Sequence, residues 1–336
     1  MNAVAIDIGT YSLKAVHAKG ASNAPQIQKV IEAPNHLGLT VPLDEVSKEK
    51  MAQQVDTLFS DHSLPTGDVR LALPESLVST KVISIPVLSD SELASAITWQ
   101  AEQHIPIPKE DLTLEYQVLY RPDRGEKDTP MRVLLIGART SMVEKYISVF
   151  NSQGIEPTYL ETQTISLMRV ARVTPTDPVT MLVQFGFSTL DCSIIRGGEL
   201  SFVFSYPNGG ILFNRALEGT LQLPIAQAEE YKRTYGLDPQ YFEGRVQAAL
   251  QPVLQSFVEQ LQKAAHFYSQ QYPQEKVQRI LLSGGSAQLP GLVPFLASTM
   301  GIEVLLIQPF ANLQGTLPQT NHSTFSVSVG LLERGE

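Results

Sequence analysis

Cysteine is nearly absent from the sequence, which contains only Cys192 among its 336 residues. A single cysteine excludes an internal disulfide framework and a cysteine-based zinc site, and it suits a reducing compartment. Histidine is also scarce, and the six histidines are scattered without the spacing of metal ligands. Because Cys192 lies in an apolar, strand-like stretch, we expect it to be a buried core residue.

Positive charge is in deficit. Lysine and arginine together number 25 against 34 aspartates and glutamates, which gives a formal net charge of -9 at pH 7. Nucleic acids and anionic membranes bind surfaces with clustered lysine and arginine, so we expect no nucleic-acid partner and no polybasic membrane contact. A small anionic ligand is still compatible with this charge, since backbone N–H groups and one metal ion can make a local site positive.

Long apolar runs are missing as well. No stretch reaches the roughly eighteen apolar residues of a membrane span. The opening residues "MNAVAIDIGT" lack the basic and apolar regions of a signal peptide. With 43% hydrophobic residues, the chain is nevertheless long enough for two domains, each with its own core. These features predict a cytoplasmic protein without a membrane span.

Short strand-like runs fill the first part of the chain. They cover 3–7, 13–18 and 26–33, and the short turns between them predict a β-meander. A helix over 48–62 and a buried strand over 69–73 are expected to follow.

From residue 73 the pattern changes. We expect a strand in "LPESLVSTKVISIP", a helix over 88–105, strands over 112–120 and 131–138, and a helix over 141–153. This block is interpreted as a small inserted subdomain of βαβ type.

Two details of this block can be tested. Ser89 or Ser91 is expected to cap its first helix, and Trp99 is expected to lie in the core with Leu93 and Ile97. The polar stretch 121–130 is interpreted as a hairpin loop.

The second half repeats the layout of the first. A meander begins again after residue 178 in "VTMLVQFG", "LDCSIIRGG" and "ELSFVFSYPNGG", and a mostly helical stretch covers 211–271. A strand, a glycine turn, a helix and a strand follow over 277–307, and an apolar helix over 325–332. The repetition predicts a duplicated α/β core with a ligand cleft between the copies.

The turn "DIGTYS" between the first two strands has the composition of a phosphate-binding hairpin. Gly9 allows the backbone to approach a ligand closely. The N–H groups of Thr10, Tyr11 and Ser12 can then point at phosphate oxygens.

Charged residues flank this turn. Asp7 ends a buried strand and needs a partner, for which a hydrated Mg²⁺ bound to phosphates is suitable. Lys14 returns on the next strand as a point charge for the same phosphates. An ordinary tight hairpin with a capping aspartate is the alternative, and the turn alone does not decide between them.

Three further segments favour a nucleotide. "QFGFST" at 184–189 repeats the hairpin, and "LLSGGSA" at 281–287 puts paired glycines between a strand and a helix, where a flat ligand can approach the backbone. In "AEEYKRTYG", Glu229 and Lys232 are neighbours on one helix face. For this last pair, a solvated surface ion pair is the alternative.

With these motifs the sequence resembles the actin-like ATPases. "DIGTYSLK" resembles their first phosphate loop, "QFGFST" the second and "LLSGGSA" the adenosine loop, in the same order and at similar spacing. "YPNGG", "AEEYKRTYG" and "FSVSVGLLERG" are similar to the FtsA and PilM branch. The segment from "LALPESL" to "LEYQVL" is similar to the inserted subdomain of the PilM family of type IV pilus assembly proteins, and the resemblance covers nearly the whole chain.

The resemblance implies an actin-like ATPase fold that binds ATP and Mg²⁺. Asp7 would orient the metal ion and its waters. The remaining implied ligand-binding residues surround the phosphates, ribose and adenine: Gly9, Thr10, Tyr11, Ser12, Lys14, Gly186, Ser188, Thr189, Glu229, Lys232, Gly284, Gly285 and Ser286.

One position departs from the family pattern. The second phosphate loop usually begins with an aspartate, and this chain has Gln184. An amide can hold a water molecule but cannot accept its proton. Glu161 or Gln163, on the connection between the halves, are candidates to compensate. Our hypothesis is that nucleotide binds and that hydrolysis is slow or absent, with no catalytic residue assigned.

The resemblance also implies a division into subdomains. The ranges are a first core subdomain at 1–72 and 161–177, an inserted subdomain at 73–160, a second core subdomain at 178–215 and 277–336, and a helical subdomain at 216–276.

The function implied is that of a cytoplasmic scaffold in the type IV pilus machine. It would bind the N-terminal tail of a PilN-like inner-membrane protein, within the inner-membrane assembly complex, and be recruited to the inner face of the membrane. The resemblance implies that the tail lies in the cleft between the first domain and the inserted subdomain, and the strand in "STKVISIP" is the candidate to line this groove. A homo-oligomer is left open.

Three alternatives stay open. A sugar-kinase-type phosphotransferase shares the core but needs a catalytic carboxylate, and Gln184 removes one obvious position. A filament-forming division protein resembling FtsA would end in an amphipathic membrane helix, unlike "LLERGE". The cytosolic part of a type II secretion protein is close in fold but usually lacks intact phosphate loops.

Overall fold

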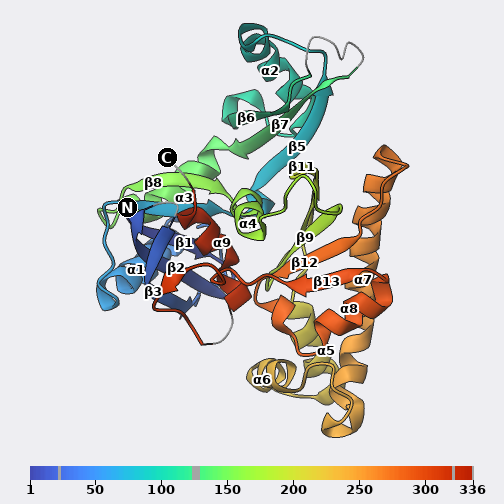
Figure 1. Cartoon of the computed structure of the whole chain (residues 1–336). Helices are drawn as coiled ribbons and strands as arrows, with labels where there is room; N and C mark the ends of the chain where they lie inside the picture. The colour runs from blue at the N-terminus through green and yellow to red at the C-terminus, as the bar shows by residue number, and fades with distance from the viewer. Residues whose placement is uncertain (22–23, 123–128, 320–321, 335–336) are drawn as a thin grey trace.

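The computed structural model (Figure 1) contains two α/β cores side by side and a small three-stranded sheet above them. It describes residues 1–21, 24–122, 129–319 and 322–334. The first core, at the left of Figure 1, carries the N-terminal strands, and the second core lies at the right. The expected α/β fold with an inserted subdomain is therefore present.

The first core is built on a mixed sheet. Its strands are β1 (Asn2–Ile8), β2 (Ser12–Ala21), β3 (Ala24–Pro34), β4 (Val69–Leu73), β8 (Pro157–Thr162) and β14 (Gln314–Gly315). They lie in the order β14-β3-β2-β1-β4-β8. β1 to β3 form the predicted antiparallel meander, and β4 joins β1 in parallel. Because β1 is central and buried, the turn that follows it starts from a rigid position.

Helices cover both faces of this sheet. They are α1 (Glu45–Asp61), α3 (Thr140–Asn151), α4 (Gln163–Ala171) and α9 (Ser326–Leu332). Successive side chains of a strand point to opposite faces, so Val4 and Ile6 pack with α1 and α3, whereas Ala3 and Ala5 pack with α9. The small alanines leave room for α9 to approach the sheet closely.

The second core repeats this topology. Its strands are β9 (Thr180–Phe185), β10 (Leu190–Arg196), β11 (Glu199–Tyr206), β12 (Arg279–Ser283) and β13 (Glu303–Leu306). Their order, β11-β10-β9-β12-β13, matches β3-β2-β1-β4-β8 of the first core strand for strand. The predicted duplication is confirmed, and the buried Cys192 lies in β10 as expected.

A long helix supports the second sheet. The helices of this half are α5 (Ile211–Leu221), α6 (Ile225–Tyr235), α7 (Arg245–Gln271) and α8 (Leu292–Met300). Leu250, Leu254, Phe257 and Leu261 form one buried stripe of α7, at the spacing of a helix face. α5 and α6 lie at the lower end of the molecule in Figure 1.

Short 3₁₀ helices also occur among the described residues: η1 (Glu75–Leu77), η2 (Lys109–Asp111), η3 (Tyr241–Gly244), η4 (Ser286–Gln288) and η5 (His322–Phe325).

The inserted subdomain has its own small sheet. It consists of β5 (Val78–Ile85), α2 (Asp90–His104), β6 (Leu112–Tyr120) and β7 (Met131–Arg139), with β7 in the middle and antiparallel to both neighbours. Ser89 caps α2 in a capping box with Glu92, as predicted. α2 covers one face of the sheet, and Leu134 on the other face packs against the second core.

Two expectations for this region are wrong. Trp99 is 57% exposed, because the buried face of α2 is formed by Leu93, Ile97 and Ala101, and Trp99 lies on the opposite side of the helix. The residues from 140 to 160 do not pack as part of the inserted subdomain, since α3 buries Tyr146 in the first core and β8 pairs with β4. Of the expected hairpin loop 121–130, residues 123–128 lie outside the described residues.

Candidate functional site

A cavity of about 270 Å³ lies where the two cores meet. It is bordered by the β1–β2 turn, the β9–β10 turn, the β12–η4 turn and α6, which are the four segments that the sequence singles out. All fourteen predicted site residues line it: Asp7, Gly9, Thr10, Tyr11, Ser12, Lys14, Gly186, Ser188, Thr189, Glu229, Lys232, Gly284, Gly285 and Ser286.

The first hairpin is held by its own backbone. The Gly9 N–H donates to the Ser12 carbonyl at 3.0 Å, and the Asn35 amide donates to the Gly9 carbonyl at 2.8 Å. A Cβ atom on Gly9 would lie 2.8 Å from Lys14 Nζ, so the absence of a side chain lets the ammonium cross the turn. Lys14 is thereby aimed into the cavity.

Asp7 is only 2% exposed, and it has two partners. Lys14 Nζ lies 3.9 Å from its Oδ2. The Gln163 side-chain amide donates to its Oδ1 at 2.7 Å. Of the two residues considered as a compensation for Gln184, Gln163 therefore reaches the cavity. Glu161 is instead engaged with Arg169, at 2.7 Å.

The second hairpin has the same backbone hydrogen-bond pattern as the first. The Gly186 N–H donates to the Thr189 carbonyl at 2.9 Å, as Gly9 does to Ser12. The two hairpins also touch across the cleft, since Thr10 Oγ1 and Ser188 Oγ are 2.8 Å apart. The two phosphate-loop candidates are therefore opposite walls of one space.

Aromatic rings make a second contact between these walls. The centroids of Tyr11 and Phe187 are 5.2 Å apart. Partial burial raises the pKa of Tyr11 above its ordinary value of 10.

The β12–η4 turn forms the floor between the hairpins. Gly284 has a φ of +93°, and a Cβ there would lie 2.4 Å from the Phe185 carbonyl oxygen. Only glycine meets both conditions. Ser286 Oγ donates to the Gly186 carbonyl at 2.9 Å, which ties this turn to the second hairpin.

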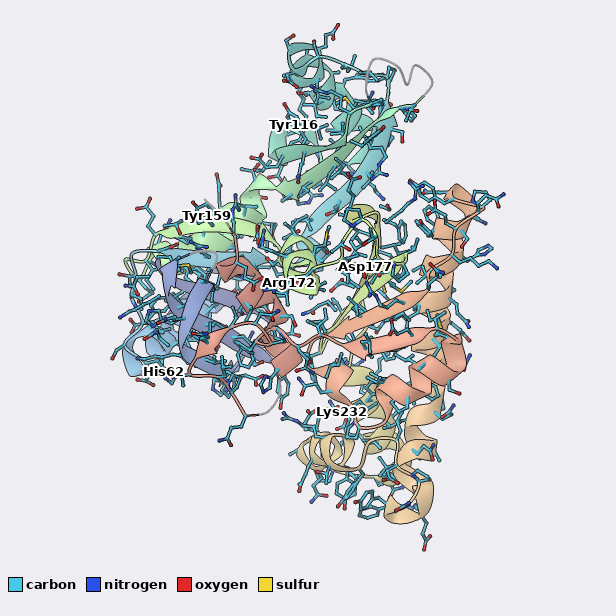
Figure 2. All side chains as sticks on the ribbon, viewed as in Figure 1. His62, Tyr116, Tyr159, Arg172, Asp177 and Lys232 are labelled. Atoms are coloured by element: carbon cyan, nitrogen blue, oxygen red, sulfur yellow. The ribbon has the colours of Figure 1, made fainter. Side chains whose placement is uncertain are left out.

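Glu229 and Lys232 form a buried cluster and not a solvated surface pair. Lys232, labelled on α6 in Figure 2, is 6% exposed, and its Nζ lies 2.5 Å from Glu229 Oε2. Asn214 of α5 bridges the two residues, with bonds of 2.8 Å to each. Burial lowers the pKa of Lys232, and the Glu229 carboxylate opposes this effect. The polar face of α6 is thus fixed toward the cavity.

Gln184 is the residue at the expected position of an aspartate. Its Oε1 is buried and has no hydrogen-bond partner among the described residues. A buried, unpaired carbonyl oxygen costs free energy unless a donor reaches it. Gln184 lines the cavity with other atoms of the residue.

Sequence reasoning missed three carboxyl groups in the cavity: Glu32, which accepts a hydrogen bond from Ser12 Oγ at 2.7 Å, and two whose pKa values are raised, Asp191 and Glu75. Asp191 of β10 is the cross-strand partner of Gln184, and it accepts hydrogen bonds from Thr189 at 2.9 Å and Ser205 at 2.5 Å. Burial raises the pKa of Asp191 to about 6. Burial, with a smaller contribution from Asp191, raises the pKa of Glu75 to about 7.

The sequence features that could have identified Asp191 and Glu75 differ in strength. Asp191 could have been found by pairing the hairpin strands, because the residue opposite Gln184 shares its face of the sheet. Glu75 had no such signal, since it follows a buried strand in what reads as a connecting loop. Only the fold brings it to the cavity.

Metal ligation would depend on few protein groups. Within the part of the chain that the structure describes, no group of three or more histidine, cysteine, aspartate or glutamate residues is arranged to hold a metal ion. A Mg²⁺ ion held mainly by phosphates and water, with one or two carboxylates, is compatible with this finding. The helices of the described residues also include none that is both long and apolar enough to cross a lipid bilayer.

Comparisons with known proteins agree with this architecture. The solved structure of a PilM-PilN type IV pilus biogenesis complex superposes with a TM-score of 0.83 at 24% identity, covering 99% of this chain and 98% of that chain. MreB 5 of Spiroplasma citri bound to AMPPNP gives a TM-score of 0.57 at 12% identity, with coverages of 98% and 94%. These likenesses establish the actin-like ATPase fold.

A sequence relative and a family match complete the comparison. The ethanolamine utilization protein EutJ of Salmonella typhimurium is 25% identical over 189 residues, which are 56% of this chain and 57% of that protein. The chain therefore spans little more than half the length of that relative. The family described as type IV pilus assembly protein PilM matches residues 5–331. The chain belongs to the PilM family of type IV pilus assembly proteins.

Proposed function

We propose that this chain is a nucleotide-binding scaffold of the type IV pilus assembly machine, which binds ATP with Mg²⁺ and holds the cytoplasmic tail of a PilN-like inner-membrane protein. The observation that carries the proposal is the meeting of two copied hairpins over one cavity, with Thr10 and Ser188 2.8 Å apart. Two turns that each offer backbone N–H groups to one space suit a polyphosphate.

The residues present fit such a ligand. Lys14 would contact the phosphates, and Asp7 would hold the hydrated Mg²⁺, which offsets phosphate charge when bound. Gln184 lines the same cavity, and its buried Oε1 has no partner among the described residues. Gly284 leaves the floor of the cavity without a side chain, where a flat base can lie.

The opposite end of the cavity fits a nucleoside. Glu229 and Lys232 would contact ribose and adenine, with Gly284, Gly285 and Ser286 below the base. These roles agree with the orientation of α6 toward the cavity. MreB 5 of Spiroplasma citri, which has the same fold, binds the nucleotide AMPPNP.

Hydrolysis is proposed to be slow or absent. The neutral Gln184 cannot take a proton from water. Both carboxylate oxygens of Asp191 accept bonds from hydroxyl groups, and Gln163 is bonded to Asp7. The cavity therefore favours retention of ATP over turnover, as a scaffold requires.

The partner tail is proposed to lie along β6 and not along β5. β5 lies against β11 of the second core, and Val82 of β5, like Leu119 of β6, packs on the cluster that contains Leu200. β6 is the other edge of the small sheet, and Tyr116 on this strand is exposed, far from Lys232 in Figure 2. An exposed sheet edge offers backbone groups to an extended peptide. The partner's class is taken from the PilM-PilN complex, which has the same fold.

A thermal-shift experiment tests nucleotide binding. At about a hundred times the dissociation constant, Mg-ATP should add roughly 2.7 kcal/mol to the free energy of unfolding. Lys14→Ala should abolish the shift. Lys19→Ala, on the exposed end of the same strand, should keep it. No shift in the wild-type protein, or equal shifts in both variants, would refute the proposed site.

A further inference from the structure

Glu75 is a buried acid at the connection between the first core and the inserted subdomain. It begins η1, directly after Pro74 at the end of β4, and β5 follows η1. Its side chain is buried, yet it lines the cavity. Carboxylates are rarely buried to this extent without partners, so the partners of Glu75 indicate what it connects.

Those partners belong to different elements. Thr80 Oγ1 of β5 donates to Glu75 Oε1 at 3.0 Å. The Thr164 N–H, in the first turn of α4, donates to Glu75 Oε2 at 3.4 Å. The carboxyl group therefore joins the edge strand of the inserted subdomain to a helix of the first core.

The backbone N–H of Glu75 extends this series of hydrogen bonds toward Asp7. Its N–H donates to Gln163 Oε1 at 3.4 Å, while Gln163 Nε2 donates to Asp7 Oδ1 at 2.7 Å. The oxygen and the nitrogen of the Gln163 side-chain amide are therefore both engaged in hydrogen bonds. The amide cannot turn toward a new partner at Asp7 without changing its bond to Glu75.

We propose that Glu75 couples occupancy of the cavity to the position of the inserted subdomain, through the hydrogen bonds that join Asp7, Gln163, Glu75 and Thr80. This inference rests on the proposed nucleotide binding. A ligand that changes the contacts of Asp7 also changes those of Gln163, and Glu75 transmits the change to Thr80. Coupling requires such differential contacts between the two states, and the series provides them.

The effect extends beyond Thr80 because β5 is one strand of a continuous sheet. β5 pairs with β7 along its whole length, with Thr80 opposite Ile136. β7 in turn pairs with β6, the strand proposed for the partner tail. A shift of β5 therefore moves the sheet as one body, and the nucleotide regulates the edge that the partner meets.

Hydrogen-deuterium exchange with mass spectrometry tests this coupling in the full chain. Adding Mg-ATP to the wild-type protein should change exchange in peptides over 78–105, by about fivefold or more in rate for a typical coupling. Thr80→Val keeps the β-branched shape and does not line the cavity. It should keep the nucleotide-dependent thermal shift and lose the exchange response.

A matched control uses the same chemistry on β6, the opposite edge strand of the same sheet. Thr113 of β6 shares a hydroxyl hydrogen bond of 2.8 Å with Thr140, outside the series. Thr113→Val should therefore keep the response. Thr80→Ser keeps the hydroxyl group and should keep the exchange response, whereas Thr80→Ala should lose it. These two variants test the coupling if Thr80→Val does not fold.

The outcomes separate this inference from the proposed function. Absence of a thermal shift in the wild-type protein overturns nucleotide binding, and the coupling with it. A thermal shift without an exchange response over 78–105 overturns the coupling alone. So does a response that persists in Thr80→Val and Thr80→Ala.

Discussion

Replacing Glu75 by glutamine is expected to stabilise the ligand-free protein at alkaline pH. The pKa of Glu75 is raised from 4.5 to about 7 by burial. The folded state consequently binds a proton that the unfolded state releases between these values. Since stability falls with pH wherever the folded state binds more protons, the wild-type protein loses stability as pH rises from about 4.5 to about 7.

The size of this loss follows from the same two values. Each tenfold change in proton affinity corresponds to 1.36 kcal/mol, so the charged carboxylate lowers the free energy of unfolding by about 3 kcal/mol at pH 8. Glutamine can reproduce the contacts of the protonated acid. Its oxygen can accept from the Thr164 N–H, and its amide can donate to the Thr80 hydroxyl. Glu75→Gln should thus be more stable than the wild type by about 3 kcal/mol at pH 8, with little difference at pH 4.5.

Urea unfolding at several pH values measures this difference. Glu49→Gln, an exposed position on α1, is the control and should match the wild type throughout. If Glu75→Gln loses stability by the same amount at pH 8 and pH 5, the carboxylate is not costly in the folded state, and the reasoning from burial is wrong.

Two further predictions concern packing. Gly284→Ala should destabilise the protein by several kcal/mol in thermal unfolding. At this position φ is +93°, and a Cβ would lie 2.4 Å from the Phe185 carbonyl oxygen. Gly285→Ala should change the stability little, because the nearest contact of its Cβ would be at 4.0 Å. Trp99→Ala should cost less than about 1 kcal/mol because the side chain is exposed, whereas Ile97→Ala should cost about 2–5 kcal/mol. Equal losses within either pair would contradict the packing described.

Local patterns were sufficient for most of the fold. Short apolar runs separated by turn residues, and the repetition of this pattern after residue 178, predicted both meanders. Helix capping was equally local, as Ser89 and Glu92 show. Trp99 was misplaced because apolar residues on both sides of α2 suggested a wider buried face than the small sheet provides.

The candidate site was predictable only in part. Its turns were recognised because glycines and hydroxyl residues follow buried strands, and they do meet at one cavity. Asp191 depended on strand register, and Glu75 depended on how the inserted subdomain joins the first core. The positions of Asp191 and Glu75 depend on tertiary structure, and the sequence around each of them has no distinctive pattern. No short motif therefore identifies these two residues.

The position of α9 has a consequence for biosynthesis. Although α9 lies almost the full length of the sequence away from β1, its Val327 and Leu331 cover the face of the first sheet that carries Ala3 and Ala5. At about 5–20 residues per second, a ribosome leaves that apolar face bare for tens of seconds. The second sheet, whose strands fall between residues 180 and 306, is complete before α9 emerges. The half of the protein that is made first therefore completes its packing only after the last helix has been made.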